Sequence, residues 1–238
     1  MRAAMAKNRA GITVHAINHV PPGGAVFYAS LPDASEACKE LLIATLWDRF
    51  QATATPLWNN CRPSGKVACP IQLVSGPLGR PQLHLGGYRG PAISFSRGGG
   101  KVWAALAGDE SDIGIDVAGS AEFQGVYPFQ RVFHPDELHH ALQLTDGKLE
   151  GAAALLWSVK EAVVKALGCG FHLVEPRQIS VYPAAGGEGG YTFPVGLSGK
   201  ALARFPLAAV RFLRVHSLLQ GKMWLSIAVI KSSQVDHE

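Results

Sequence analysis

Cysteine is scarce in this chain, with four residues in 238, and no two of them form a Cys-x-x-Cys pair. Zinc sites and dithiol redox centres usually need cysteines at such close spacing. The sequence therefore indicates neither, and reduced thiols are expected. His134, His139 and His140 are close in sequence. A helical histidine pair on a polar face is usually solvated, so we do not expect these histidines to bind a metal.

Long apolar runs are also absent. No stretch approaches the roughly 18 apolar residues of a membrane-spanning helix, and no hydrophobic signal region is evident. A cytoplasmic protein without membrane contact is therefore expected. The net charge of +4 is modest, and no run of lysine and arginine is interleaved with aromatic residues. The composition thus favours acidic partners and gives no indication of nucleic-acid binding.

An apolar segment that carries two charged residues predicts a helix over residues 152–167. Projected at about 100° per residue, Glu161 and Lys165 lie on one flank, whereas Leu155, Val159 and Val163 lie on the other. Gly168 follows the last periodic residue and is typical of a helix end. The simple alternative is a surface ion pair that contributes ~0.3 kcal/mol to the helix.

A second segment, residues 111–117, has the alternation of a short buried strand. It directs Ile113, Ile115 and Val117 to one side and Asp116 to the other. A carboxylate is costly to bury unless a cation neutralises it. Asp116 is therefore interpreted either as a structural residue at a hydrated strand end or as a ligand of a metal ion.

These segments carry a recognisable pair of motifs. Residues 114–117 read Gly-Ile-Asp-Val, and residues 157–165 read Trp-Ser-Val-Lys-Glu-Ala-Val-Val-Lys. Weaker motifs occur in matching order: Gly-Arg-Pro at 79–81, Ile-Ser-Phe-Ser-Arg at 93–97, and Arg-Val-Phe-His-Pro-Asp-Glu-Leu at 131–138. Over roughly residues 79–175 the chain resembles the 4′-phosphopantetheinyl transferases, specifically the large monomeric type that activates surfactin synthetase.

Helices and strands are mixed without regular βαβ spacing, which predicts the α+β class. The resemblance implies two similar α+β halves related by a pseudo-two-fold axis, with the active site between them. We expect residues 1–108 to form the half that contacts coenzyme A phosphates. Residues 109–238 are expected to hold the metal site and the catalytic helix.

The resemblance also implies an activity and its site. The expected reaction is Mg²⁺-dependent transfer of the 4′-phosphopantetheine group from coenzyme A to a serine of an acyl or peptidyl carrier protein. Asp116 and Glu161 would hold the metal, and these two with Lys165 would be catalytic. The coenzyme A phosphates would be bound by Arg80, Ser96, Arg97, Lys160 and Lys165.

Three departures from the family pattern motivate an alternative. Ala118 stands where the family usually has a metal-binding glutamate, and Glu122 lies just downstream. Arg97 replaces a histidine that contacts the 3′-phosphate, and arginine can bind the same group. The basic N-terminal helix of the family is not evident. A homologue that binds the carrier protein or coenzyme A without catalysis is therefore the alternative, and the two hypotheses differ in their need for Mg²⁺.

Further elements follow from periodicity. Residues 35–50 predict an amphipathic helix whose core face is Leu41, Leu42, Thr45 and Leu46. Strands are expected within 93–106, at 178–183, and as a closing antiparallel pair at 207–215 and 223–230. The Pro/Gly-rich run at 70–90 is interpreted as a separator between the first helical region and the strand that begins at Ile93.

Overall fold

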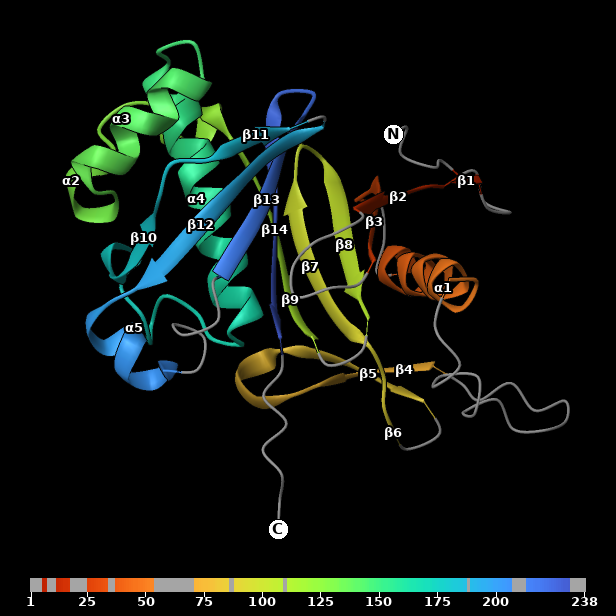
Figure 1. Ribbon diagram of the computed structural model, residues 1–238. Coiled ribbons are helices and arrows are strands. Elements are labelled where there is room, and N and C mark those ends of the chain that lie inside the picture. Colours follow the sequence, from red (N-terminus) through yellow and green to blue (C-terminus); the bar gives the residue numbers. More distant parts are fainter. Residues whose placement is uncertain are drawn as a thin grey trace, which may run out of the picture.

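The computed structural model describes residues 6–7, 12–17, 25–33, 37–53, 71–85, 88–108, 111–187, 189–206 and 213–231. Two antiparallel sheets dominate it (Figure 1). The first has the strand order β1 (Ala6–Lys7), β2 (Thr13–Ile17), β3 (Val26–Pro32), β8 (Lys101–Ala107), β7 (Ala92–Gly98). The second has the order β10 (Ile179–Val181), β12 (Gly190–Leu197), β13 (Leu213–Gln220), β14 (Met223–Lys231), β9 (Ser111–Gly119), and β11 (Ala185–Gly187) pairs with β12.

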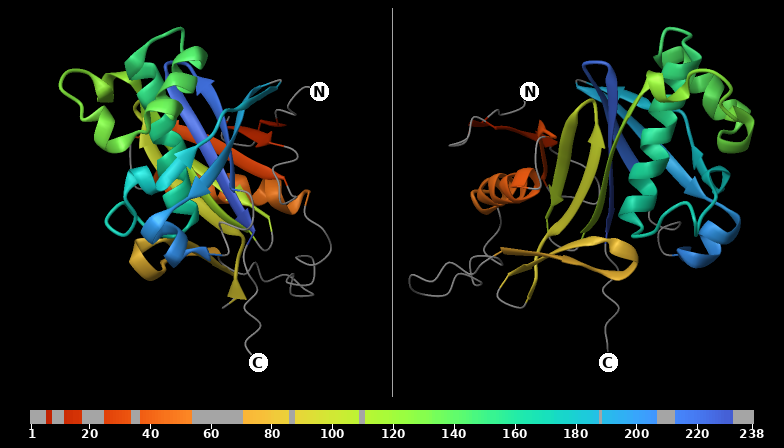
Figure 2. Two further views of the ribbon diagram at one scale, coloured as in Figure 1. Left: turned by 60° about the vertical axis from the view of Figure 1, so that its left-hand side comes forward. Right: turned by 180° about the vertical axis from the view of Figure 1, so that it is seen from behind.

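The molecule is layered, with a helix outside each sheet (Figure 2). Helix α1 (Ala37–Gln51) packs on the first sheet, and α4 (Leu149–Ala166) packs on the second. A third apolar cluster, which includes Tyr28, Trp103, Ile115 and Ile227, fills the space between the sheets. This arrangement confirms the predicted α+β class.

The two sheets share a topological unit. In the first, β3 pairs with β8, which forms a hairpin with β7. In the second, β9 pairs with β14, which forms a hairpin with β13. A helix lies between the first strand and the hairpin in both units. The predicted boundary after residue 108 falls in the connection between β8 and β9.

Smaller elements complete the chain. Helices α2 (Phe129–Val132), α3 (Pro135–Leu144) and α5 (Gly199–Arg204) belong to the second half. Short 3-10 turns occupy Pro77–Gly79, Ser120–Phe123 and Pro176–Gln178. Pro135 begins α3, where its fixed φ and missing N–H cost nothing.

Three local predictions need correction. Residues 70–90 are not merely a separator, because most of them form a small sheet of β4 (Ile71–Ser75), β5 (Pro81–Leu85) and β6 (Tyr88–Arg89). Leu41 was placed in the core face of α1 but is 42% exposed, and Ile43 is buried instead. The first strand of the closing pair, β13, continues to Gln220 rather than ending at 215, and the predicted residues 207–212 lie outside the described residues.

Candidate active site

Strand β9 brings Asp116 to the face of the second sheet that α4 covers. Ile113, Ile115 and Val117 point into the cluster between the sheets, as the alternation predicts. Asp116 points the other way, and its side chain is only 10% exposed. A carboxylate this buried requires partners.

Those partners come from two other elements. Lys165 of α4 places Nζ 2.6 Å from Oδ1 of Asp116 and also donates to the carbonyl of Ile115 at 3.1 Å. Ser96 of β7 donates its hydroxyl to the same Oδ1 at 2.9 Å. The structure thus brings together three of the residues predicted from sequence, across the junction of the two halves.

Glu161 lies one helical turn before Lys165, on the same flank of α4. Burial raises the pKa of its carboxyl group, the negative charge of Asp116 raises it further, and Lys165 opposes both effects. Two carboxylates that disfavour each other's charge are a site that a cation stabilises. Mg²⁺ commonly takes only one or two protein carboxylates and completes its shell with water and phosphate oxygens.

The donor set therefore fits Mg²⁺, with Asp116 and Glu161 as the residues that would hold it. Within the described ranges, no group of three or more histidine, cysteine, aspartate or glutamate side chains gathers around one point. Ala118 is fully buried in the core beneath α4 and offers no ligand atom. Glu122 accepts the backbone N–H of Gly119 at 2.7 Å, which explains its place in a 3-10 turn.

Gly114 allows α4 to approach β9 this closely. A Cβ at this position would lie 1.9 Å from the carbonyl oxygen of Ala162 and 2.6 Å from the backbone nitrogen of Ala166. Both obstructing atoms are helix backbone, which cannot move aside as a side chain can. The glycine of the Gly-Ile-Asp-Val motif is therefore needed for space rather than for an unusual φ.

A cleft of about 610 Å³ opens beside this cluster. Its cationic lining residues come from three elements: Lys39 of α1, Arg80 before β5, and Lys165 of α4. No carboxylate lines it among the residues that the structure describes. Ile93, Phe95 and Ile113 supply apolar walls. Such a cleft suits an anion that also carries an apolar part.

Arg80 joins the small sheet to the second half of the chain. It forms an ion pair with Asp112 of β9 at 2.7 Å and donates to the carbonyl of Ala166, at the end of α4, at 3.3 Å. Arg89 reaches the same aspartate at 3.2 Å. The hairpin of β4 and β5 consequently lies across the ends of β9 and α4, as the views of Figure 2 show.

Arg97 and Ser96 point to opposite faces of β7. Arg97 follows Phe95 by two residues and so lies on the same face of β7. Phe95 lines the cleft wall. Its guanidinium Nε is 3.1 Å from Asp33, and the side chain is 54% exposed. Ser96 therefore belongs to the carboxylate cluster, whereas Arg97 lies beyond the cleft wall.

The structure places Lys160 away from the other predicted site residues. Its side chain is fully buried, and Nζ forms an ion pair with Glu137 of α3 at 2.6 Å. The same ammonium donates to the carbonyls of Pro176 at 2.9 Å and Val132 at 3.2 Å. The expectation that Lys160 contacts coenzyme A phosphates is corrected on this geometry, because a ligand cannot reach a fully buried and fully bonded ammonium.

Comparison with known proteins bears on this geometry. Residues 112–205 match the model of the 4′-phosphopantetheinyl transferase superfamily. The match includes α4 and nearly all of β9, and it confirms the resemblance to the superfamily that their motifs predicted. The large monomeric type stays a prediction. A search of curated protein sequences gives no match. No helix in the described ranges has the length and apolar character needed to span a membrane.

Solved structures of similar fold cover about half of the chain. The apo-ACPS structure of Chronobacterium ammoniagenes is 22% identical, covers 50% of this chain and 94% of its own, and gives a TM-score of 0.40. The ACPS-CoA complex from the same organism is 22% identical, with coverages of 52% and 98% and a TM-score of 0.42. Holo-[acyl-carrier-protein] synthase of Thermotoga maritima is 18% identical, with coverages of 51% and 63% and a TM-score of 0.35.

Sequence reasoning missed two residues of this region. Lys39 lies in the helix predicted at 35–50 but was given no role there, and Glu137 was noted only within the motif at 131–138. For Lys39 a signal was available, because the helix dipole disfavours a lysine in the first turn of a helix. No local signal reveals the pairing of Glu137 with Lys160.

Proposed function

We propose that this protein transfers the 4′-phosphopantetheine group from coenzyme A to a serine hydroxyl of an acyl or peptidyl carrier protein and releases 3′,5′-ADP. One observation carries the proposal: Asp116, Glu161 and Lys165 converge beside a cleft lined by cations, inside the segment that matches the superfamily. The ACPS-CoA complex among the structures of similar fold concerns a protein that binds the same donor.

The reaction joins a serine oxygen to the β-phosphorus of coenzyme A and breaks the bond from that phosphorus to the oxygen that bridges to the adenosine 5′-phosphate. Lys165 would neutralise negative charge as it moves to the departing 3′,5′-ADP. Arg80 and Lys39 line the same cleft and would bind nucleotide phosphates, and Arg97 would bind the 3′-phosphate.

The serine must also lose its proton. Glu161 is the candidate base, because burial and Asp116 raise the pKa of its carboxyl group and so strengthen its affinity for a proton. Asp116 and Glu161 would hold Mg²⁺. When bound, that ion supplies Lewis-acid stabilisation of charge on the phosphate oxygens.

The alternative is a homologue that binds coenzyme A or a carrier protein without transferring the group. Ala118 favours it, since the buried methyl group leaves Asp116 and Glu161 as the only predicted metal ligands. The two functions differ in metal dependence. A catalyst needs Mg²⁺ for turnover, whereas a binding protein retains its partner in EDTA.

The test is intact mass spectrometry of apo carrier proteins from fatty acid, polyketide and peptide synthesis, each incubated with this protein, coenzyme A and Mg²⁺. A gain of one phosphopantetheine group, absent with EDTA and absent with the Asp116→Asn variant, is expected on at least one carrier. Binding of coenzyme A without any gain would instead establish the alternative. The same panel identifies the carrier class. Three further points stay predictions: the holo-[acyl-carrier-protein] synthase type, the monomeric state and the cytoplasmic location.

A further inference from the structure

Glu137 is the centre of a buried polar junction outside the cleft. Its Oε1 forms the ion pair with Lys160 at 2.6 Å and accepts the backbone N–H of His134 at 2.8 Å. Its Oε2 accepts the backbone N–H of Val181 in β10 at 3.0 Å. One carboxylate thus ties together α3, α4 and the edge of the second sheet.

Lys160 completes the junction from α4. Its Nζ also bonds to the carbonyls of Val132 and Pro176, which lie in α2 and a 3-10 turn, and it sits 5.6 Å from the centre of the Phe133 ring. The side chains of Lys160 and Glu137 are 0% and 2% exposed. Charged groups buried this completely are held in fixed geometry by their hydrogen bonds.

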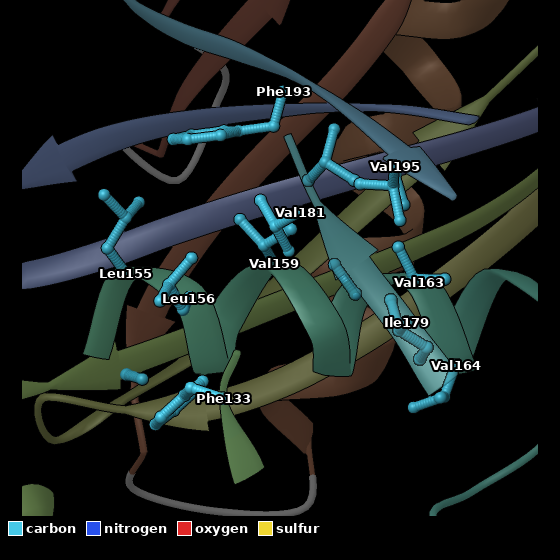
Figure 3. Close-up of a cluster of buried hydrophobic side chains, with 14 of the residues drawn as sticks. Phe133, Leu155, Leu156, Val159, Val163, Val164, Ile179, Val181, Phe193 and Val195 are labelled. Atoms are coloured by element: carbon cyan, nitrogen blue, oxygen red, sulfur yellow. The ribbon is translucent and has the colours of Figure 1, made fainter. Parts of the chain in front are cut away.

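Most other contacts of α4 are apolar and less directional. Figure 3 shows Leu155, Val159 and Val163 packed against valine and phenylalanine side chains of β10 and β12. Apolar packing tolerates small rotations, because dispersion has no preferred angle. A buried hydroxyl chain from Ser158 to Ser226 and on to Ser217, with oxygen separations of 2.7 Å, holds the helix against β14 and β13.

Rotation of α4 decides where the candidate site residues point. Lys160 and Glu161 are consecutive and diverge by about 100° around the helix, and Lys165 follows Glu161 by one turn. A rotation of about 20° would move a side-chain tip at a radius of roughly 6 Å by about 2 Å. The contact of 2.6 Å between Lys165 and Asp116 would not survive such a shift.

We propose that Glu137 is a positioning residue: through Lys160 it fixes the rotation of α4 and so presents Glu161 and Lys165 to Asp116. The inference rests on the proposed function for its kinetic consequence, but the geometry that it predicts exists whether or not transfer occurs. The junction lies within the second half and does not line the cleft. It can therefore affect a ligand in the cleft only through the position of α4.

The kinetic test compares Lys160→Met, Glu137→Gln and the double variant Lys160→Met/Glu137→Leu with the wild type. A misplacement of about 1 Å can lower a rate about 100-fold. We expect a fall in kcat of about tenfold to 100-fold in the single variants, with a smaller change in KM for coenzyme A. The double variant should regain melting temperature, because apolar pairs can replace buried ion pairs, but it should not regain kcat.

Val164→Ala is the matched control, because Val164 is 1% exposed, lies one turn after Lys160 and takes no part in the junction. It should lose melting temperature and keep kcat. Recovery of both melting temperature and kcat in the double variant, or an equal loss of kcat in the control, would overturn the proposal, because the junction would then be merely structural.

A second measurement does not need activity. The unfolding midpoints of Asp116→Asn, Lys165→Met and the two combined form a double-mutant cycle that reports the ion pair between these residues. Non-additivity is expected in the wild-type background and should vanish in the Lys160→Met/Glu137→Leu background. If non-additivity persists there, the positioning inference fails. If the wild type shows no transfer to any carrier but the cycle behaves as expected, only the proposed function fails.

Discussion

Lys165 donates from Nζ to Oδ1 of Asp116 over 2.6 Å, which connects a helix to a strand 49 residues earlier in the chain. The same lysine lines the cleft that carries Arg80 and Lys39. One ammonium group therefore borders both the carboxylate pair and the space that an anion would enter. This shared position would suit the proposed transfer, since the carboxylates that would hold the metal and the leaving group must be adjacent.

Loss of Glu161 or Lys165, the two candidate catalytic residues of α4, should greatly lower turnover. Glu161→Ala and Lys165→Ala are each expected to lower kcat about 100-fold or more, because Glu161 would hold the metal and accept the serine proton, and Lys165 would stabilise charge on the departing 3′,5′-ADP. Initial rates with a carrier protein found in the mass-spectrometric panel provide the measurement. Glu150→Ala, in the first turn of the same helix, is the control. Rates near the wild type in both site variants would refute the assignment of the site.

Removal of divalent metal should abolish transfer but leave the fold intact. EDTA is expected to lower the rate to background, and added Mg²⁺ should restore it, since Asp116 and Glu161 are carboxylates of the type that Mg²⁺ prefers. Glu161→Gln should raise the Mg²⁺ concentration needed for half-maximal rate. A titration of rate against Mg²⁺ measures both effects. Full activity in EDTA would show that the carboxylate pair has a different role.

Arg97 offers a test with a truncated substrate. If its guanidinium binds the 3′-phosphate, Arg97→Ala should raise KM for coenzyme A about tenfold, which corresponds to the loss of a charge-assisted hydrogen bond of roughly 1.5 kcal/mol. The variant and the wild type should then have similar KM values for dephospho-coenzyme A, which lacks that phosphate. Arg214→Ala, an exposed arginine on β13, is the control. An equal rise with both substrates would place Arg97 at another phosphate or in a structural role.

The sequence predicted β9 and α4 well because apolar residues recur in each at the spacing of a strand or a helix. In β9 the alternation correctly separates Asp116 from Ile113, Ile115 and Val117. In α1 the apolar pattern did not predict the buried face correctly, since Leu41, Leu42 and Ile43 are consecutive and all apolar. The hydrophobic pattern there does not distinguish one helix face from its neighbour, so Leu41 was assigned to the wrong side.

Tertiary contacts explain the errors at Lys160 and at the small sheet. A lysine next to Glu161 in a family motif suggested a second phosphate contact, yet Lys160 is neutralised by Glu137, 23 residues earlier. Nothing local indicates that pairing, because it depends on how α3 packs on α4. The small sheet of β4 to β6 was missed for a related reason. Its proline and glycine residues indicate turns, and the ion pairs from Arg80 and Arg89 to Asp112 that stabilise it cannot be read from the local sequence.

Stability should decline as the pH falls below the ordinary pKa of histidine. Burial lowers the pKa of His216 in β13 from its usual 6.5, so the folded protein binds that proton less readily than the unfolded chain does. The stabilising contribution is therefore complete above about pH 6.5 and is lost as the pH falls toward the folded pKa. Melting temperatures from about pH 8 to pH 5 should fall less in His216→Asn than in the wild type. His139→Asn, at an exposed position, should behave like the wild type.

Gly114→Ala should damage the protein at the contact between β9 and α4. The added methyl group would lie 1.9 Å from the carbonyl oxygen of Ala162, so the helix must move outward. Overpacking of this kind typically destabilises by about 1–3 kcal/mol, and here the outward shift also separates Lys165 from Asp116. Chemical unfolding should report the first effect, and a fall in kcat larger than the loss of folded protein should report the second.

The matched control for this variant is Gly187→Ala in β11. A Cβ at Gly187 would meet no heavy atom within 4 Å, and its φ lies outside the positive range, so its stability and kcat should both stay close to the wild type. Retention of wild-type kcat in Gly114→Ala would mean that the helix can withdraw from β9 without separating the candidate catalytic residues. The close approach would then serve folding alone, and the placement of Lys165 would depend on the Glu137 junction rather than on the glycine.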